Sequence, residues 1–242
     1  MLTSVLLRRG GAVVTWLNHH SALESMRAGV PLAQFDHVGI DGTLLSRLVR
    51  AGRPRTTADL VLPVLLGDLR DLRVALVGSS AAALAATSSR IREDFGHDVV
   101  LAVDGYDGLP APGDLRRRLG ELEAHLVIVG LGAPRQDAYA LALRAPGCLV
   151  VTCGGWIDQF SQDHYYPPWA YPLRLNWLVR LYREPRRLWR RYSTEAWRAV
   201  LLRRQLTAYV VGPGQAPAAG QGRGGPRPGA GDGAPGTRGT PC

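Results

Sequence analysis

The sequence predicts an α/β protein with a Rossmann-like parallel sheet and helices on both faces. Short apolar, β-branched runs are each followed by a glycine-containing turn and then by leucines or alanines at helical spacing. The clearest run, residues 126–130, is apolar throughout, as expected of a strand buried on both faces of a parallel sheet. With 242 residues, 46% of them hydrophobic, the chain can form one large domain with appendages.

The turn after residues 126–130 is the first candidate site. Gly130 and Gly132 permit a tight turn, and Pro134 suits the first position of a helix. The helix then offers free N–H groups and a positive dipole end to a phosphate, with Arg135 and Gln136 adding a charge and an amide. An ordinary strand–turn–helix joint is the alternative. The third glycine of a dinucleotide fingerprint is missing, so NAD is not favoured.

The N-terminal half predicts strands over 12–17 and 37–40, and helices over 21–28 and 43–51. Asn18 follows the first strand and could contact a ligand or cap a helix. The adjacent His19 and His20 diverge on any regular backbone, which argues against a metal site. Asp41 ends the second strand at a helix start, where the dipole would hold its carboxylate ionised as a base requires; a helix N-cap is the alternative.

The middle of the chain continues the alternation. Residues 60–66 read as buried helix or strand. Further strands are expected over 73–77, 99–103 and 148–153, and further helices over 81–95 and 115–124. Asp104 and Asp107 lie in a glycine-rich turn and lack the close spacing of a metal-binding pair, so a solvated loop is favoured.

Several polar residues follow these strands directly. Because ligands of such sheets bind beyond the carboxyl ends of the strands, we expect these side chains to converge on one crevice. The candidates are Asn18, Asp41, Ser79, Arg135, Gln136 and Asp158.

The chain changes character after Ser161. Arginines interleave with tryptophan and leucine over 173–192, and a second amphipathic helix is expected from Pro185 onward. This pattern suits a helix on an anionic membrane surface; a solvated arginine face packed on the body, or a nucleic-acid-binding surface, are the alternatives. We therefore expect a catalytic domain over 1–161, a basic helical appendage over 162–211 and a disordered Gly/Pro-rich tail over 212–242.

The amino-acid composition indicates which kinds of partner and which cell compartment to expect. The formal charge is +9 and the chain has no lysine, so arginine supplies every positive side chain and an anionic partner is indicated. Cys148, Cys153 and Cys242 show no zinc or disulfide spacing, which fits a reducing cytoplasm. Residues 5–7 are too short for a signal-peptide core, and no apolar run approaches the roughly 20 residues of a membrane span.

Three stretches together resemble the WecG/TagA/CpsF family of bacterial glycosyltransferases. They are Asp41-Gly42, residues 129–137 (Val-Gly-Leu-Gly-Ala-Pro-Arg-Gln-Asp) and residues 177–192, within a resemblance running from about Val13 to Tyr192. The resemblance implies a Rossmann-type enzyme that moves an N-acetylmannosamine-type sugar from a UDP donor to a polyprenyl-diphosphate-linked acceptor. It also implies inversion at the anomeric carbon, no bound metal or other cofactor, and an arginine-rich C-terminal segment that completes the site at the membrane.

Carried over by motif, Asp41 is the expected base and Gln136 positions the substrate. Thr15 or Asn18 stands for the family's Thr-x-Asn, although one extra residue separates them here. The other expected substrate-binding residues are Gly42, Gly78, Ser79, Gly132, Ala133, Pro134, Arg135, Asp158, Arg180, Arg183 and Arg187.

The chain also departs from the family pattern. Ile40 replaces a proline, Asp137 and Asn176 replace glutamates, and Tyr165 stands where an arginine is usual. These changes imply either a different donor sugar or lost activity. The leading expectation is a cytoplasmic enzyme, peripheral on the inner face of the cell membrane, acting in cell-surface polysaccharide or teichoic acid synthesis. A nucleotide-sugar-binding homologue with impaired catalysis and a basic nucleic-acid-binding module are the rivals.

Overall fold

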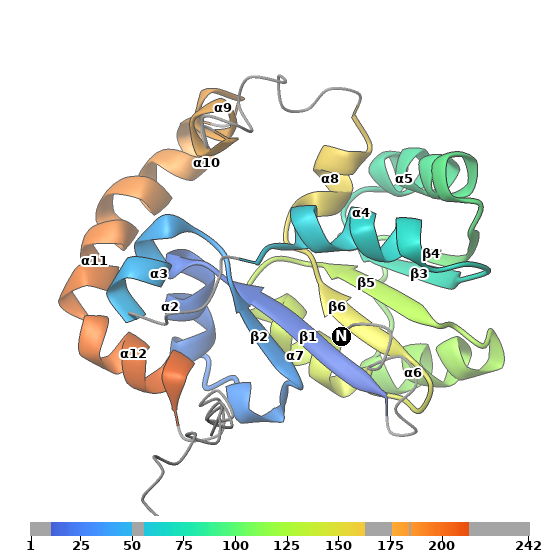
Figure 1. The fold of residues 1–242 in the computed structure, drawn as a ribbon, viewed down its shortest axis with the longest axis horizontal. Coiled ribbons are helices and arrows are strands. Elements are labelled where there is room, and N and C mark those ends of the chain that lie inside the picture. The colour runs from blue at the N-terminus through green and yellow to red at the C-terminus, as the bar shows by residue number, and fades with distance from the viewer. Residues whose placement is uncertain (1–10, 50–55, 163–175, 184, 213–242) are drawn as a thin grey trace, which may run out of the picture.

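The computed structural model describes residues 11–49, 56–162, 176–183 and 185–212. Its centre is a six-stranded sheet, parallel throughout, in the order β2-β1-β6-β5-β3-β4 (Figure 1). The strands are β1 (Ala12–Leu17), β2 (His37–Ile40), β3 (Arg73–Gly78), β4 (Asp98–Val103), β5 (Leu126–Gly130) and β6 (Leu149–Thr152). The predicted α/β Rossmann-like sheet is therefore confirmed.

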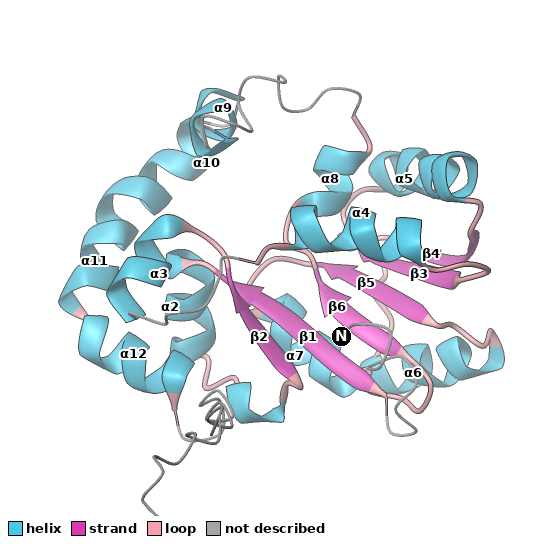
Figure 2. Ribbon diagram, in the orientation of Figure 1, coloured by secondary structure: helices cyan, strands magenta, loops and turns pink. Residues whose placement is uncertain are grey.

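Helices cover both faces of the sheet, as predicted (Figure 2). One face packs against α2 (His19–Arg27), α3 (Thr43–Val49), α6 (Pro112–Glu121), α7 (Arg135–Ala142), α11 (Ala196–Leu201) and α12 (Arg203–Val211). The other face packs against α4 (Ala58–Asp68), α5 (Ala81–Phe95) and α8 (Trp156–Phe160). A short 3-10 turn, η1 (Leu32–Gln34), precedes β2.

Strand β5 shows why the apolar run was informative. Leu126 and Ile128 face the core formed with α4, α5 and α8, whereas Val127 and Val129 face the core formed with α2, α6 and α7. All four side chains are fully buried. Because alternate residues of a strand point to opposite faces, only a strand covered on both sides needs an apolar residue at every position.

The connections after the strands change direction along the carboxyl edge of the sheet. The chain leaves β1 and β5 toward helices on one face, α2 and α7, but leaves β6 toward α8 on the opposite face. Since β6 lies between β1 and β5, its loop diverges from both neighbouring loops. Such a change of direction is where doubly wound sheets bind their ligands.

Several boundaries differ from the sequence predictions. Helix α2 begins at His19 rather than at residue 21, because Asn18 already caps it. Residues 60–66 lie within α4, which continues through Pro63. Helix α6 starts at Pro112, earlier than expected, and α8 was not expected at all. Turn-forming glycines at 154 and 155 hid α8, whose five residues give too little periodicity to recognise.

The C-terminal helices run along one side of the molecule (Figure 1). Helix α9 (Asn176–Arg183) and α10 (Pro185–Arg190) lead through the π-helical turn η3 (Arg191–Glu195) into α11 and α12. Ala199, Leu206 and Val210 are buried in the core that also contains β1 and α2. Residues 163–175 and the predicted tail from 213 onward lie outside the described residues. No helix within the described part of the chain is both long and apolar enough to span a bilayer.

Candidate active site

The loops after β1 and β2 bring Asn18 and Asp41 together. The Asp41 N–H donates to the Leu17 carbonyl at 2.7 Å, so the two strand ends stay paired. A Cβ placed on Gly42 would lie 3.6 Å from the Cβ of Asn18. The Asn18 side-chain oxygen accepts from the N–H groups of His20 and Ser21 at 3.0 and 3.1 Å, which is the capping role that the sequence left open.

Thr15 lies inside the sheet, in the middle of β1, rather than beyond its carboxyl end. Its side chain is fully buried in the middle of β1, on the face covered by α2 and α7. The hydroxyl donates to Asp137 Oδ1 at 2.8 Å and lies 2.8 Å from the Thr152 hydroxyl. Of the two residues that could stand for the family's Thr-x-Asn, only Asn18 therefore lies beyond the end of the strand.

The β5–α7 turn has the tight backbone that its glycines predict. Gly132 has a φ of 74°, and its carbonyl accepts from the Gln136 N–H at 2.8 Å. Helix α7 begins at Arg135, so Pro134 stands just before the helix instead of at its first position; the Ala133–Pro134 peptide is cis. The Arg135 side chain is exposed at this helix start, where it can meet an anion.

Gln136 connects this turn to the neighbouring β6–α8 loop. Its side-chain oxygen accepts from the Gly154 N–H at 3.2 Å, and the residue is only 4% exposed. Among the described residues, the amide nitrogen of Gln136 has no hydrogen-bond partner. The carbonyl end of the side chain thus holds the site together, and the NH2 end is available to donate to a ligand.

A second contact joins the loops after β3 and β6. The Ser79 hydroxyl donates to Asp158 Oδ1, and the Ser79 carbonyl accepts from the Gly105 N–H at 3.0 Å. Ser79 has a φ of 64°, an uncommon backbone conformation for a residue with a side chain. The neighbouring Gly78 pairs with Gly130, and a Cβ on Gly78 would lie 2.4 Å from the Gly130 carbonyl oxygen.

The contacts between the predicted residues fall into two sets along the carboxyl edge of the sheet. Asn18, Asp41 and Gly42 lie at β1 and β2, whereas Ser79, Gln136 and Asp158 lie around β3, β5 and β6. Strands β1 and β6 separate β2 from β5, which corresponds to about 14 Å at the usual strand spacing. Arg180, Arg183 and Arg187 belong to α9 and α10, but their side chains lie outside the described part of the structure.

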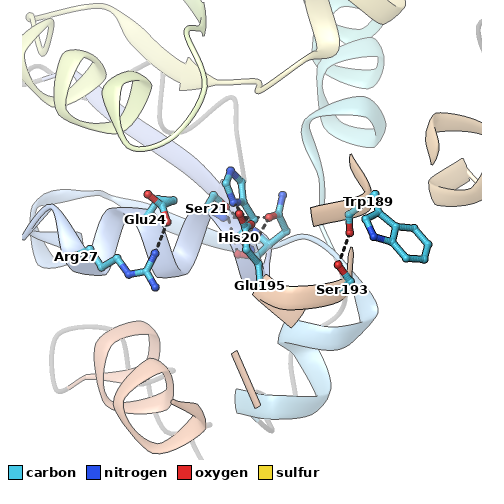
Figure 3. A network of polar contacts seen from close by, with 8 residues as sticks. His20, Ser21, Glu24, Arg27, Trp189, Ser193 and Glu195 are labelled. Atoms are coloured by element: carbon cyan, nitrogen blue, oxygen red, sulfur yellow. Dashed lines mark hydrogen bonds and ion pairs between the residues drawn. The ribbon is translucent and has the colours of Figure 1, made fainter. Parts of the chain in front are cut away.

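A contact that the sequence did not reveal joins the C-terminal helices to this edge. The Nδ1 atom of His20, in the first turn of α2, lies 2.5 Å from Glu195 Oε2 at the end of η3 (Figure 3). Both side chains are partly buried. The two residues are 175 positions apart, and only the three-dimensional arrangement could pair them.

The acidic loop after β4 has the character expected of a turn. Asp104 Oδ1 accepts from the N–H groups of Tyr106 and Asp107 at 2.7 and 3.1 Å. These hydrogen bonds lower the pKa of the Asp104 carboxyl. Within the described ranges, no three His, Cys, Asp or Glu side chains come close enough together to hold a metal ion.

The all-parallel sheet, with glycine turns and polar side chains along its carboxyl edge, defines a doubly wound α/β protein, a class that binds its ligands at this edge. Residues 2–209 match the model of the glycosyl transferase WecG/TagA/CpsF family. Because the match covers most of the chain, the protein belongs to this family and is a glycosyltransferase of cell-surface polysaccharide synthesis. The resemblance inferred from the three sequence stretches is thereby confirmed.

Proposed function

We propose that the protein is an inverting glycosyltransferase that moves an N-acetylmannosamine-type sugar from a UDP donor to a polyprenyl-diphosphate-linked acceptor. The observation that supports the proposal is the row of candidate side chains along the carboxyl edge of the sheet. A carboxylate, Asp41, stands at the β1–β2 end, and the glycine turns with Arg135 stand near β5. The distance between β2 and β5 suits a UDP-sugar whose diphosphate lies at the glycine turns and whose sugar extends toward Asp41.

Asp41 is the proposed general base. It takes the proton from the acceptor hydroxyl while that oxygen forms a bond to the anomeric carbon of the donor sugar. The bond from this carbon to the phosphate oxygen breaks in the same step, so the configuration inverts and UDP leaves with the electron pair. A positioned base of this kind contributes roughly 10²–10⁴ in rate.

The leaving diphosphate gains negative charge as the bond breaks. We assign its stabilisation to the backbone N–H groups of Gly132, Ala133 and Arg135 and to the start of α7, since positive dipole ends and charges act most strongly where charge develops. By the family resemblance, Arg180, Arg183 and Arg187 are proposed to add positive charge to the same diphosphate site. Gln136 donates its NH2 group to the substrate from beside the turn.

The nucleoside is assigned to the β3–β5–β6 side of the carboxyl edge. Gly78 keeps the backbone close to β5, and Ser79 with Asp158 offers a hydroxyl and a carboxylate to the ribose or the base. Asn18 and Gly42 then line the acceptor side, next to Asp41.

The outer face of the C-terminal helices supports a peripheral membrane location. Tyr182, Trp189, Trp197 and Leu201 are between 65% and 87% exposed on α9, α10 and α11. Exposed aromatic rings beside arginines are typical of helices that rest in the interface of an anionic membrane. A lipid-linked acceptor would be reached from there, on the cytoplasmic face of the cell membrane. Sedimentation with anionic but not neutral liposomes tests this placement, and equal binding to both contradicts it.

Glycosyl transfer itself is tested by measuring UDP release from UDP-N-acetylmannosamine with a lipid-diphosphate acceptor. Asp41→Asn is expected to lower kcat by roughly 10²–10⁴, because the amide cannot accept the proton. Asp98→Asn, which removes an exposed carboxylate at the start of β4 and therefore at the opposite edge of the sheet, is the matched control and is expected to leave the rate unchanged. Equal rates for wild type and Asp41→Asn would remove Asp41 from this role.

The rival function is a nucleotide-sugar-binding homologue with impaired catalysis. It is favoured by the departures at Ile40, Asp137, Asn176 and Tyr165. Isothermal titration with UDP, run beside the turnover assay, separates the two functions. Binding of UDP without turnover on several donor sugars supports the rival, whereas turnover on any of them excludes it.

A further inference from the structure

Asp137 is a buried acid that the proposed chemistry does not use. It is 0% exposed in the first turn of α7, directly after Gln136. Its Oδ2 accepts from the Ser25 hydroxyl of α2 at 2.6 Å, and its Oδ1 accepts from Thr15 of β1 at 2.8 Å. Burial raises the pKa of the Asp137 carboxyl, and the two hydroxyl donors offset part of that increase. Placing such a group in a core is costly, so it calls for an explanation.

The contacts of Asp137 extend to a second strand. The Thr15 hydroxyl, which donates to Asp137, also lies 2.8 Å from the hydroxyl of Thr152 at the end of β6. Both threonines are buried on the same face of the sheet, where α2 and α7 cover them. The carboxyl group of Asp137 thus links α7 directly to β1 and α2 and, through Thr15, to β6.

These links close into a ring. Gln136 precedes Asp137 in the chain, and its side-chain oxygen accepts from the Gly154 N–H. Gly154 in turn lies two residues after Thr152. Starting from Asp137, one can therefore pass through Thr15, Thr152, Gly154 and Gln136 and return to Asp137, crossing only hydrogen bonds and short stretches of chain.

We propose that Asp137 is a positioning residue, which fixes Gln136 and the loops after β1, β5 and β6 in the arrangement that transfer requires. This role rests on the proposed glycosyl transfer. The residue acts through its neighbours and does not touch the substrate, because its side chain is fully buried and both carboxylate oxygens accept from Thr15 and Ser25. The same proposal gives the buried Thr15 a role, because its hydroxyl links Asp137 to Thr152 of β6.

The test compares kcat for Asp137→Asn and Thr15→Val with kcat for Thr87→Val. Thr87 is a matched control because it is equally buried and donates one hydrogen bond, to the Ile157 carbonyl, but lies on the opposite face of the sheet. That carbonyl keeps a second donor, the Ser161 N–H. All rates are measured at a temperature where circular dichroism shows each variant fully folded, and Thr15→Val serves alone if Asp137→Asn does not fold.

We expect both ring variants to lower kcat about tenfold to a hundredfold, since small displacements of positioned groups cost that much. We expect Thr87→Val to stay within about twofold of wild type even though it loses a comparable buried hydrogen bond. In the double variant with Gln136→Ala, the loss should be smaller than the product of the single losses, because both changes disable the same element. Hydrogen exchange at the Gly154 N–H should accelerate in the ring variants and not in the control.

Independent losses in the double variant, or equal losses in the ring variants and the control, would overturn the positioning role. Unchanged kcat in both ring variants would do the same. If wild type transfers no sugar from any donor, the proposed function fails first, and the hydrogen-exchange comparison at Gly154 then tests the ring by itself. Unchanged exchange there overturns the inference as well.

Discussion

At Gly78 the backbones of β3 and β5 approach closely at the carboxyl edge of the sheet, and adding one methyl group there tests this close approach. Its φ is 111°, which an alanine adopts only with strain, costing roughly 1–2 kcal/mol. The new Cβ would also stand 2.4 Å from the Gly130 carbonyl oxygen and 2.6 Å from its carbon. Both neighbours are backbone atoms of a paired strand, so relief requires β3 and β5 to separate, at a further cost of about 1–3 kcal/mol.

Gly29 provides the matched control for this substitution. It has a φ of 68°, yet nothing lies within 4 Å of its added Cβ. Gly29→Ala should therefore lose only about 1–2 kcal/mol of unfolding free energy, whereas Gly78→Ala should lose about 2–5 kcal/mol. Urea denaturation followed by tryptophan fluorescence measures both. Losses that agree to within about 0.5 kcal/mol would refute the close-approach argument, because steric contact would then contribute nothing.

Two further predictions concern buried titratable groups. The raised pKa of Asp137 means that the folded state binds its proton more tightly than the unfolded state does, so the stability contributed by this group falls as pH rises from about 4 through the raised value. Urea denaturation over this pH range measures the unfolding free energy of wild type and of Asp137→Asn. As pH rises, the unfolding free energy of Asp137→Asn should increase relative to that of wild type. A difference that stays constant with pH would contradict the raised pKa of Asp137. Burial raises the pKa values of Cys148 and Cys153 to about 12, so both thiols should resist alkylation at pH 8 in the native protein and react in guanidinium. Peptide mass spectrometry measures the alkylation of each cysteine. Rapid alkylation of either thiol in the native protein would contradict the burial of that side chain.

The fold was predictable because local and global signals agree along most of the chain. A run such as 126–130 is apolar at every position, and helix α5 was delimited at the correct residues by Ser80 and Gly96. Ser80 caps that helix with its hydroxyl, and Gly96 ends it in the left-handed conformation. Propensity, capping and burial all indicate the same boundaries there.

Predictions were weaker where a residue's role depends on distant partners. Asn18 was recognised as either cap or ligand, but nothing in its neighbourhood could show that Gly42 lies beside it. Asp137 was noted only as a departure from the family motif, although Thr15 and Ser25 donate to it from more than a hundred residues away. Hydrogen bonds between elements depend on strand order, and the order β2-β1-β6-β5-β3-β4 leaves no mark in a single sequence.

Helix α11 has consequences for how this protein can be shortened or redesigned. Its inner residue Ala199 is fully buried against the sheet domain, while Trp197 and Leu201 on the same short helix are each 65% exposed. A chain cut before this helix would bare the core residues that it and α12 cover, so the segment is not a removable anchor. Polar replacements of the exposed residues on its outer side, in contrast, should change the binding properties of this surface and leave the packing of the core unchanged.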